Sequence, residues 1–224
     1  MLFPDYKLIP MGESAIMIDF GNETDEALNS RVIGLSDMIS STGFKGFVEC
    51  VPAYSSIAVF YDPSSLASEA QSAFAAVSEI IREFAAVEPE SRREEQRTFD
   101  IPVDFSSSNA PDLEFVASHN GLEPEHVIDI FTSRVYRVFM LGFLPGFPYL
   151  GTIDERIAAP RLETPRISVP RGSVGIAGRQ TGIYPLQSPG GWRLIGRTET
   201  DLFTPYGDLP TLLSPGDRVR FLRV

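Results

Sequence analysis

The sequence contains very few of the side chains that build metal, redox or nucleophilic sites. Its 224 residues include one cysteine, Cys50, and two histidines, His119 and His126. A single cysteine excludes an internal disulfide framework and a CxxC motif, and it favours a reducing compartment, so we expect a cytoplasmic protein. The histidines lie on different expected helices with only Asp129 nearby, which is too few ligands for a metal. We therefore expect no metal site.

Familiar nucleotide and hydrolase motifs are also missing. The sequence has no G-x-x-x-x-G-K-[ST] or G-x-S-x-G motif, and the spacing of Gly172, Gly175 and Gly178 differs from G-x-G-x-x-G. The first residues lack the basic and apolar regions of a signal peptide, and no apolar run approaches the length of a membrane span. These absences leave nucleotide binding unsupported in this chain and predict no membrane segment.

Positive charge is scarce, and it is unevenly placed. The net charge is -11, which argues against a nucleic-acid partner because phosphate backbones bind basic surfaces. Residues 1–100 hold 17 acidic and 7 basic residues, whereas residues 101–224 hold 13 and 12. This difference indicates two parts of different character.

The first part, 1–96, alternates short strands with amphipathic helices. We expect strands at Tyr6–Pro10, Ser14–Phe20, Phe47–Val51 and Ser56–Tyr61, and the strand Thr98–Val103, just beyond this part, is expected to complete the same sheet. Apolar residues at helical spacing predict one helix that ends at Gly43 and a second one from Leu66 to Phe84. Without the leading strand, the order is β-α-β-β-α-β, that of a ferredoxin-like split unit with both helices on one sheet face. The charged run 88–97 is expected to be a surface connection.

The second part, 97–224, is predicted to be a β-barrel. Two short helices, Pro111–Asn120 and Glu123–Ser133, superficially suggest a helix-turn-helix, but the charge favours packed connector helices. After Arg134 the sequence consists of short β-prone pieces, and 142–196 contains 10 glycines and 7 prolines. This density is typical of the turns of a compact barrel, so the fold class is α+β with two domains.

Arginine is concentrated in the barrel part. Between positions 156 and 197 there is no lysine and one acid, Glu163, while the arginines are Arg156, Arg161, Arg166, Arg171, Arg179, Arg193 and Arg197. The planar guanidinium binds carboxylates and phosphates in two-point contacts, and nearby glycines let backbone N–H groups approach an anion. We expect Arg161, Arg166 and Arg179, with Gln180 and Thr181, to hold a substrate. The alternative is that each arginine pairs with an acid of the N-terminal half or lies on the barrel surface.

Two aromatic segments allow alternative interpretations. Gly190 and Gly191 precede the single tryptophan, Trp192, which is either a core residue after a turn or the wall of a substrate pocket. The stretch LGFLPGFPYLG, Leu141–Gly151, carries three rings from Phe143, Phe147 and Tyr149. They are either core residues between the domains or a partner interface.

The chain resembles a known family in three segments and along most of its length. The segments are LGFLPGFPYLG (Leu141–Gly151), PRISVPRGSVGIAG (Pro165–Gly178) and QTGIYPLQSPGGWRLIGR (Gln180–Arg197). They resemble the KipI family, whose members are also known as allophanate hydrolase subunit 1 or the 5-oxoprolinase B-subunit. The resemblance implies a ferredoxin-like N-terminal domain and a cyclophilin-like β-barrel.

The resemblance also implies a function. Similar bacterial proteins are the B-subunit of an ATP-dependent 5-oxoprolinase, which opens 5-oxoproline to glutamate together with subunits A and C. By this resemblance the chain is one component of a hetero-oligomer, inactive alone, with ATP bound by the complex. Other relatives inhibit sporulation histidine kinases or form the carboxyltransferase part of a biotin-dependent urea carboxylase.

The sequence departs from the family at two positions. Phe131 stands where many relatives have histidine, so a histidine role is in doubt there. Arg171 stands where alanine is common, which adds a cation beside the glycine-rich loop.

Overall fold

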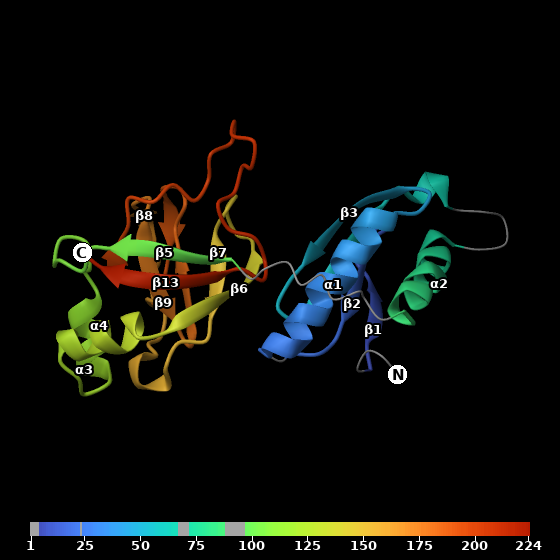
Figure 1. Cartoon of the computed structure of the whole chain (residues 1–224). Helices are drawn as coiled ribbons and strands as arrows, with labels where there is room; N and C mark the ends of the chain where they lie inside the picture. The colour runs from blue at the N-terminus through green and yellow to red at the C-terminus, as the bar shows by residue number, and fades with distance from the viewer. Residues whose placement is uncertain (1–4, 23, 67–71, 88–96) are drawn as a thin grey trace. The chain divides into compact units, whose positions relative to one another are not determined.

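The chain divides into two compact units, which are described separately. The computed structural model describes residues 5–22, 24–66, 72–87 and 97–224. The units are Met1–Glu94 and Glu95–Val224 (Figure 1). Part of the expected second helix, including Ala70, and most of the charged run 88–97 lie outside the described residues. None of the helices in the described ranges is long and apolar enough to cross a bilayer.

The first unit is a four-stranded antiparallel sheet with two helices. Its strands are β1 (Lys7–Pro10), β2 (Ala15–Asp19), β3 (Phe47–Pro52) and β4 (Ser56–Tyr61), in the order β1-β2-β4-β3. The helices are α1 (Glu26–Thr42) and α2 (Ala73–Ala85), with a short 3-10 helix η1 (Pro63–Ser65). Ile16 on β2 lies opposite Val59 on β4, and both are buried with Leu35 of α1 and Ile81 of α2. Both helices therefore cover the same face of the sheet, as expected.

The predicted order of the first unit is wrong in its last strand. Thr98–Val103 forms β5, which pairs in parallel with β13 (Arg218–Arg223) in the second unit. The fourth strand of the first sheet is β1, so the described order is β-β-α-β-β-α. Alternation of buried and exposed residues identifies Thr98–Val103 as a strand but does not say which sheet it joins. Ile101 and Val103 would point into the core in either sheet. The ferredoxin-like assignment stays a prediction.

The second unit is built on a seven-stranded sheet in the order β12-β9-β10-β7-β6-β13-β5. Besides β5 and β13 its strands are β6 (Val135–Leu141), β7 (Pro148–Gly151), β9 (Ser173–Ala177), β10 (Gln180–Ile183) and β12 (Arg193–Arg197). A separate pair joins β8 (Arg166–Val169) to β11 (Ser188–Gly190). The helices are α3 (Leu113–His119), α4 (Pro124–Thr132) and the 3-10 helix η2 (Glu155–Ile157).

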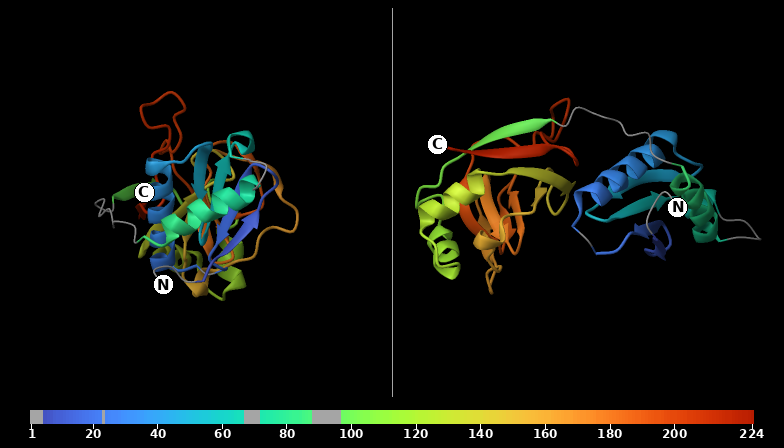
Figure 2. Two further views of the ribbon diagram at one scale, coloured as in Figure 1. Left: turned by 90° about the vertical axis from the view of Figure 1, so that its right-hand side faces the viewer. Right: turned by 60° about the horizontal axis from the view of Figure 1, so that its bottom comes forward.

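The seven-stranded sheet curves until its two edge strands meet. Asp104, directly after β5, donates its N–H to the carbonyl of Arg197 at the end of β12 at 2.8 Å, and Arg197 returns a bond of 2.9 Å. The result is a nearly closed barrel, consistent with the cyclophilin-like barrel that the resemblance implies. Figure 2 shows the strands of this unit curving around a common interior.

The connector helices pack on the barrel. Helix α3 contacts β12 and α4 contacts β13, so the pair is not displayed as a helix-turn-helix. Phe131 of α4 is fully buried, with its ring 4.8 Å from Phe221 of β13. The Tyr136 hydroxyl donates to the carbonyl of Phe131 at 2.8 Å. The position where relatives often carry histidine thus holds a core aromatic ring.

Gly172 is the tightest glycine of the barrel. Its φ is +80°, and a Cβ atom there would lie 1.9 Å from the carbonyl oxygen of Thr198. Its N–H donates to Tyr184 at 2.7 Å and its carbonyl accepts from Thr198 at 2.9 Å, so the backbone cannot move away without losing two bonds. Gly178 has a similar φ of +59° but open space around its Cβ position.

We expect Gly172→Ala to destabilise the barrel unit by about 3 kcal/mol or more, because it adds a steric clash to the backbone strain. Gly178→Ala introduces only the strain of a positive φ, without a clash, and is expected to lower the free energy of unfolding by about 1 kcal/mol. Urea unfolding followed by circular dichroism measures both. Equal losses in the two variants would contradict this account of Gly172.

Cys50 lies on β3 and is partly buried. Burial raises the pKa of its thiol to about 11 from the usual 9.0, although hydrogen bonds with Ser40 and Ser36 lower it somewhat. Because the pKa is raised on folding, the folded chain keeps a proton that the unfolded chain gives up. The stability contributed by Cys50 is therefore full below the unfolded pKa and is lost as the pH rises through about 11.

Cys50 is expected to react slowly with iodoacetamide at pH 8, because only the thiolate is the nucleophile. A shift of two pKa units lowers the thiolate fraction about a hundredfold relative to the unfolded chain. Mass spectrometry of alkylation in buffer and in urea compares the two rates. A native rate within about threefold of the unfolded rate would refute the protected thiol.

Candidate functional site

The candidate site is centred on an aromatic cluster in the second unit. Phe147 is the hub, with ring centroids 5.0 Å from Tyr149, 5.2 Å from Tyr184 and 5.4 Å from Trp192, all edge to face. Edge-to-face contacts stabilise aromatic pairs beyond the burial of their area. Phe147 directly precedes β7, Tyr149 lies in β7, Tyr184 directly follows β10 and Trp192 lies between β11 and β12, so the barrel fold brings the rings together.

Glycines let these rings approach the backbone. A Cβ on Gly182 would lie 2.8 Å from Cζ of Phe147, and a Cβ on Gly190 would lie 2.5 Å from the hydroxyl of Tyr184. The backbone N–H of Trp192 donates to that same hydroxyl. The absence of a side chain at Gly190 therefore allows the backbone to pack closely against Tyr184. This contact fixes the turn that leads into Trp192.

Arg161 lies against this cluster. Its guanidinium carbon is 5.9 Å from the ring centroid of Trp192, a cation–π contact. Burial raises the pKa of Tyr149 and of Tyr184, and the charge of Arg161 lowers both pKa values in part. The tyrosines are therefore protonated at neutral pH and present hydroxyl groups beside a cation.

The other six arginines between positions 156 and 197 have carboxylate partners. Arg166 contacts Asp112 at 2.8 Å and Arg179 contacts Glu155 at 2.6 Å. The remaining pairs are Arg156 with Asp154, Arg171 with Asp201, Arg193 with Asp112 at 3.8 Å and Arg197 with Glu199 at 3.7 Å. All of these acids belong to the second unit rather than to the N-terminal half, whereas Arg156 and Arg179 are exposed on the surface of this unit, as the other branch of the alternative expected. Among the described residues, Arg161 alone of the seven has no carboxylate within ion-pair distance.

The other predicted substrate residues are divided between surface and interior. Thr181 is fully buried and its hydroxyl donates to the carbonyl of Gly175 at 2.8 Å, so this group is committed to the barrel. Arg179 is exposed and Gln180 is half-buried. A β-bridge joins Ala159 to Gly178, which places the chain leading to Arg161 beside the chain leading to Arg179.

The three rings of the LGFLPGFPYLG segment have different environments. Phe147 is buried within its own unit, Tyr149 is half-buried, and Phe143 is 61% exposed. Phe143 has a φ of +64°, a left-handed conformation that is unusual for a residue other than glycine. Its ring stands edge-on to Phe147 and Tyr184. One ring is therefore core and one is presented outward.

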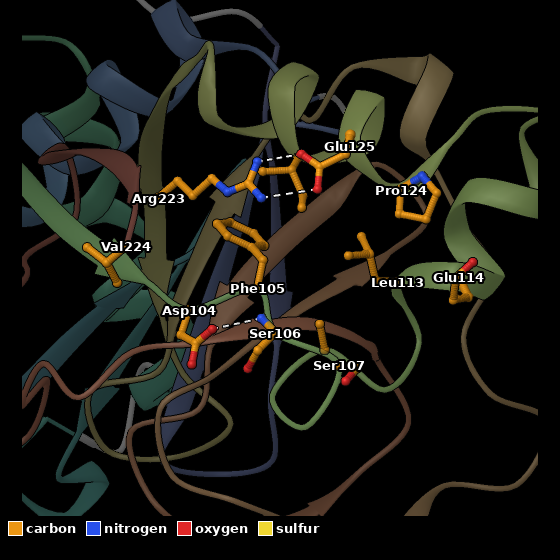
Figure 3. Close-up of a pocket in the computed structure, with 12 residues that line it drawn as sticks. Asp104, Phe105, Ser106, Ser107, Leu113, Glu114, Pro124, Glu125, Arg223 and Val224 are labelled. Atoms are coloured by element: carbon orange, nitrogen blue, oxygen red, sulfur yellow. Dashed lines mark hydrogen bonds and ion pairs between the residues drawn. The ribbon is translucent and has the colours of Figure 1, made fainter.

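A cavity of about 430 Å³ lies elsewhere in this unit, between the end of β5 and helices α3 and α4 (Figure 3). None of the predicted site residues lines it. Its charged rim is largely satisfied: Glu125 accepts from Arg223 at 3.1 Å, and Asp104 accepts from Ser106 at 2.7 Å. The lining also includes Ser107 and Glu114, and its one arginine, Arg223, is paired with Glu125. For an anionic ligand, the better candidate is therefore the Arg161 cluster, which consists of Arg161 and the rings of Phe147, Tyr149, Tyr184 and Trp192.

No metal centre can be assigned in the described ranges. They contain no group of three or more histidine, cysteine or acidic side chains placed to hold an ion.

Comparison with protein families identifies the relationship. A model described as the carboxyltransferase domain, subdomain C and D, matches residues 6–213. The chain belongs to this carboxyltransferase C and D family. The resemblance to the KipI and allophanate hydrolase subunit 1 family is confirmed.

Curated relatives of this carboxyltransferase C and D chain match along nearly all of its length. It is 47% identical to the 5-oxoprolinase B-subunit of Bacillus subtilis (strain 168), over 98% of this chain and 93% of that protein. It is 42% identical to the 5-oxoprolinase B-subunit of Escherichia coli O157:H7, over 95% of this chain and 93% of that protein.

Solved structures share the fold of this chain. A conserved uncharacterized protein from Pyrococcus horikoshii is 47% identical, with a TM-score of 0.56 over 97% of both chains. The Kluyveromyces lactis urea carboxylase has a TM-score of 0.78 and 24% identity, which shows the fold alone. This chain covers 22% of that urea carboxylase and 40% of another solved chain that is 36% identical to it.

Sequence reasoning missed two residues of the candidate site. Tyr184 follows β10, and the sequence marked it only as part of a β-prone piece within Gln180–Arg197, one of the segments that resemble the family. Asp112 lies 54 positions before Arg166, and their contact depends on the barrel. For Asp112 the available signal was the resemblance along most of the chain.

We expect Arg161→Gln to reduce iodide quenching of Trp192 fluorescence while leaving acrylamide quenching unchanged. Iodide is attracted to a cation, whereas acrylamide is neutral. A unit charge about 6 Å away in water is worth a little under 1 kcal/mol, which predicts about a threefold fall in the iodide quenching constant at low salt. Because Trp192 is the single tryptophan, the signal is specific.

Arg220→Gln is the control, since Arg220 pairs with Asp100 on the barrel surface at 2.8 Å. If iodide quenching in Arg161→Gln matched that of this control, the guanidinium would not lie on Trp192 in solution.

Proposed function

We propose that this chain is the B-subunit of a 5-oxoprolinase that hydrolyses 5-oxo-L-proline to L-glutamate together with subunits A and C. The observation that carries the proposal is the 47% and 42% identity to two bacterial 5-oxoprolinase B-subunits over 93% of each. Coupling to ATP hydrolysis by the complex is part of the proposal.

The Arg161 cluster has the chemistry to bind this substrate. 5-Oxoproline is a small, nearly flat lactam with one carboxylate. Arg161 offers a guanidinium without a carboxylate partner among the described residues, and Tyr149 offers a half-buried ring near it, while Trp192, which is only 6% exposed, contacts both from the core. Gln180 supplies an amide on the neighbouring strand and Gly191 an accessible backbone. Binding by one cation and an aromatic wall orients the ring before attack.

The described part of the Arg161 cluster does not hold a complete set of reacting groups. The described part of the cluster has no histidine and no free carboxylate, and burial raises the pKa values of Tyr149 and Tyr184. A general base and the ATP-dependent activation must come from a partner, so the B-subunit is inactive by itself. Phe143, exposed and edge-on to the cluster, is suited to dock the C-subunit next to the substrate.

Co-expressed subunits A, B and C are expected to convert 5-oxoproline to glutamate only with ATP, and the present chain alone is expected to have no activity. Within the complex, Arg161→Gln in this chain should lower kcat/KM about ten- to a hundredfold, because a hydrogen bond to a charged group is worth about 1.5–3 kcal/mol. Glutamate release measured by a coupled assay gives both constants.

Arg220→Gln is the matched control, because it removes an exposed arginine from the same barrel without touching the cluster. The absence of 5-oxoproline turnover by the assembled wild-type complex would refute the function. Turnover unaffected by Arg161→Gln would refute the site and leave the function standing.

The kinase-inhibitor and urea carboxylase activities that the resemblance implies remain the alternatives. Binding to a histidine kinase, or capture of a biotinylated partner from native cells, would favour them. The identity to urea amidolyase of Saccharomyces cerevisiae is 25% over 13% of that protein, which gives the carboxyltransferase alternative less support.

A further inference from the structure

Asp112 stands at the start of α3 but does not cap the helix with its side chain. Aspartate at this position usually accepts a hydrogen bond from the first helical N–H groups. Here the carboxylate reaches across to β12, where Oδ2 accepts from the N–H of Leu194 at 2.7 Å. The backbone N–H of Asp112 donates to the carbonyl of Leu194 at 2.9 Å. The residue is 6% exposed, so its charge is held inside the fold.

The other carboxylate oxygen of Asp112 faces two arginines. Oδ1 accepts from Nη2 of Arg166 at 2.8 Å, and Nη1 of Arg193 lies 3.8 Å away. Arg193 also lies 3.5 Å above the ring of Phe115 on α3. A buried carboxylate with these partners holds both guanidinium groups in fixed positions.

Each of these arginines makes a second contact, and both contacts lie at the Arg161 cluster. Arg166 donates from Nη1 to the carbonyl of Trp192 at 3.4 Å. Arg193 donates from Nε to the carbonyl of Pro160 at 3.2 Å. The N–H of Leu162 donates to the carbonyl of Gly191 at 2.8 Å. Residues 160–162 are thus fastened across residues 191–193, with Arg161 facing Trp192.

We propose that Asp112 is a positioning residue: through Arg166 and Arg193 it holds the guanidinium of Arg161 on the face of Trp192. The consequence for turnover rests on the proposed function, but the positioning itself does not. Arg166 and Arg193 then act as fasteners rather than as ligands of the substrate, and Arg161 is the group that meets its carboxylate.

The test uses Asp112→Asn in the full chain, with the single tryptophan as reporter. An asparagine oxygen still accepts from the N–H of Leu194, but the charge that holds Arg166 is gone. We expect the ratio of iodide to acrylamide quenching of Trp192 to fall about threefold, to the level of Arg161→Gln, because the cation leaves the ring. A merely structural loosening would raise quenching by both agents and leave their ratio unchanged.

Asp217→Asn is the matched control. Asp217 is another buried carboxylate of the same unit, 7% exposed, which binds Arg97 at 2.6 Å and the N–H of Ser214 at 2.7 Å. It has the same kinds of partner, and none of them contacts the aromatic cluster. We expect its quenching ratio to equal that of the wild type.

A quenching ratio in Asp112→Asn equal to that of Asp217→Asn overturns the proposal. If Asp112→Asn does not fold, Arg166→Met decides, because it removes one fastener and keeps the bond from Leu194 to Asp112. Because Arg166→Met also removes a cation near Trp192, the deciding comparison is with Arg161→Gln/Arg166→Met: equal ratios in the two variants support the proposal, and a further fall in the double variant overturns it.

The assembled complex adds an independent result. Asp112→Asn should raise KM for 5-oxoproline about tenfold with kcat within about twofold, as expected when ground-state binding is lost. A wild-type complex without 5-oxoproline turnover would refute the proposed function, while the quenching ratio would still decide the role of Asp112.

Discussion

The second unit depends on the closure of its sheet. Two backbone hydrogen bonds between Asp104 and Arg197 join the strands at opposite ends of the strand order. From this seam the loop 105–112 leads to α3, and at its end Asp112 and Leu194 are joined by two further hydrogen bonds. The carboxylate that holds Arg166 is therefore placed by the same register that closes the barrel. An open sheet would separate Asp112 from the segment it fastens.

Glycine makes both the seam and the aromatic cluster possible. A Cβ on Gly196 would lie 2.6 Å from Cγ1 of Val103, and a Cβ on Gly175 would lie 3.0 Å from Cβ of Trp192. These residues stand inside β12 and β9, where glycine normally weakens a strand. Glycine is required at these two positions despite its cost in strand stability, because any side chain would collide with the neighbouring strand or with Trp192. The glycine-rich composition thus reflects close packing as well as turns.

The sequence predicted local features well and partners poorly. Helical and strand periodicity identified the elements, and the density of glycine and proline indicated the barrel. The sequence did not reveal that Thr98–Val103 joins the sheet of the second unit, because its alternation of buried and exposed residues fits either sheet. It grouped Arg161, Arg166 and Arg179 as equals, because the carboxylates that neutralise two of them become neighbours only in the fold. Arg171, the departure from the family, likewise contacts Asp201.

The closed barrel also limits how another protein can attach to it. An open sheet edge can accept a strand from any chain of suitable length, with little regard to side chains. Where β5 meets β12, that route is closed by the bonds of Asp104 and Arg197. A partner that binds at this seam must then recognise side chains or loops rather than a free strand edge.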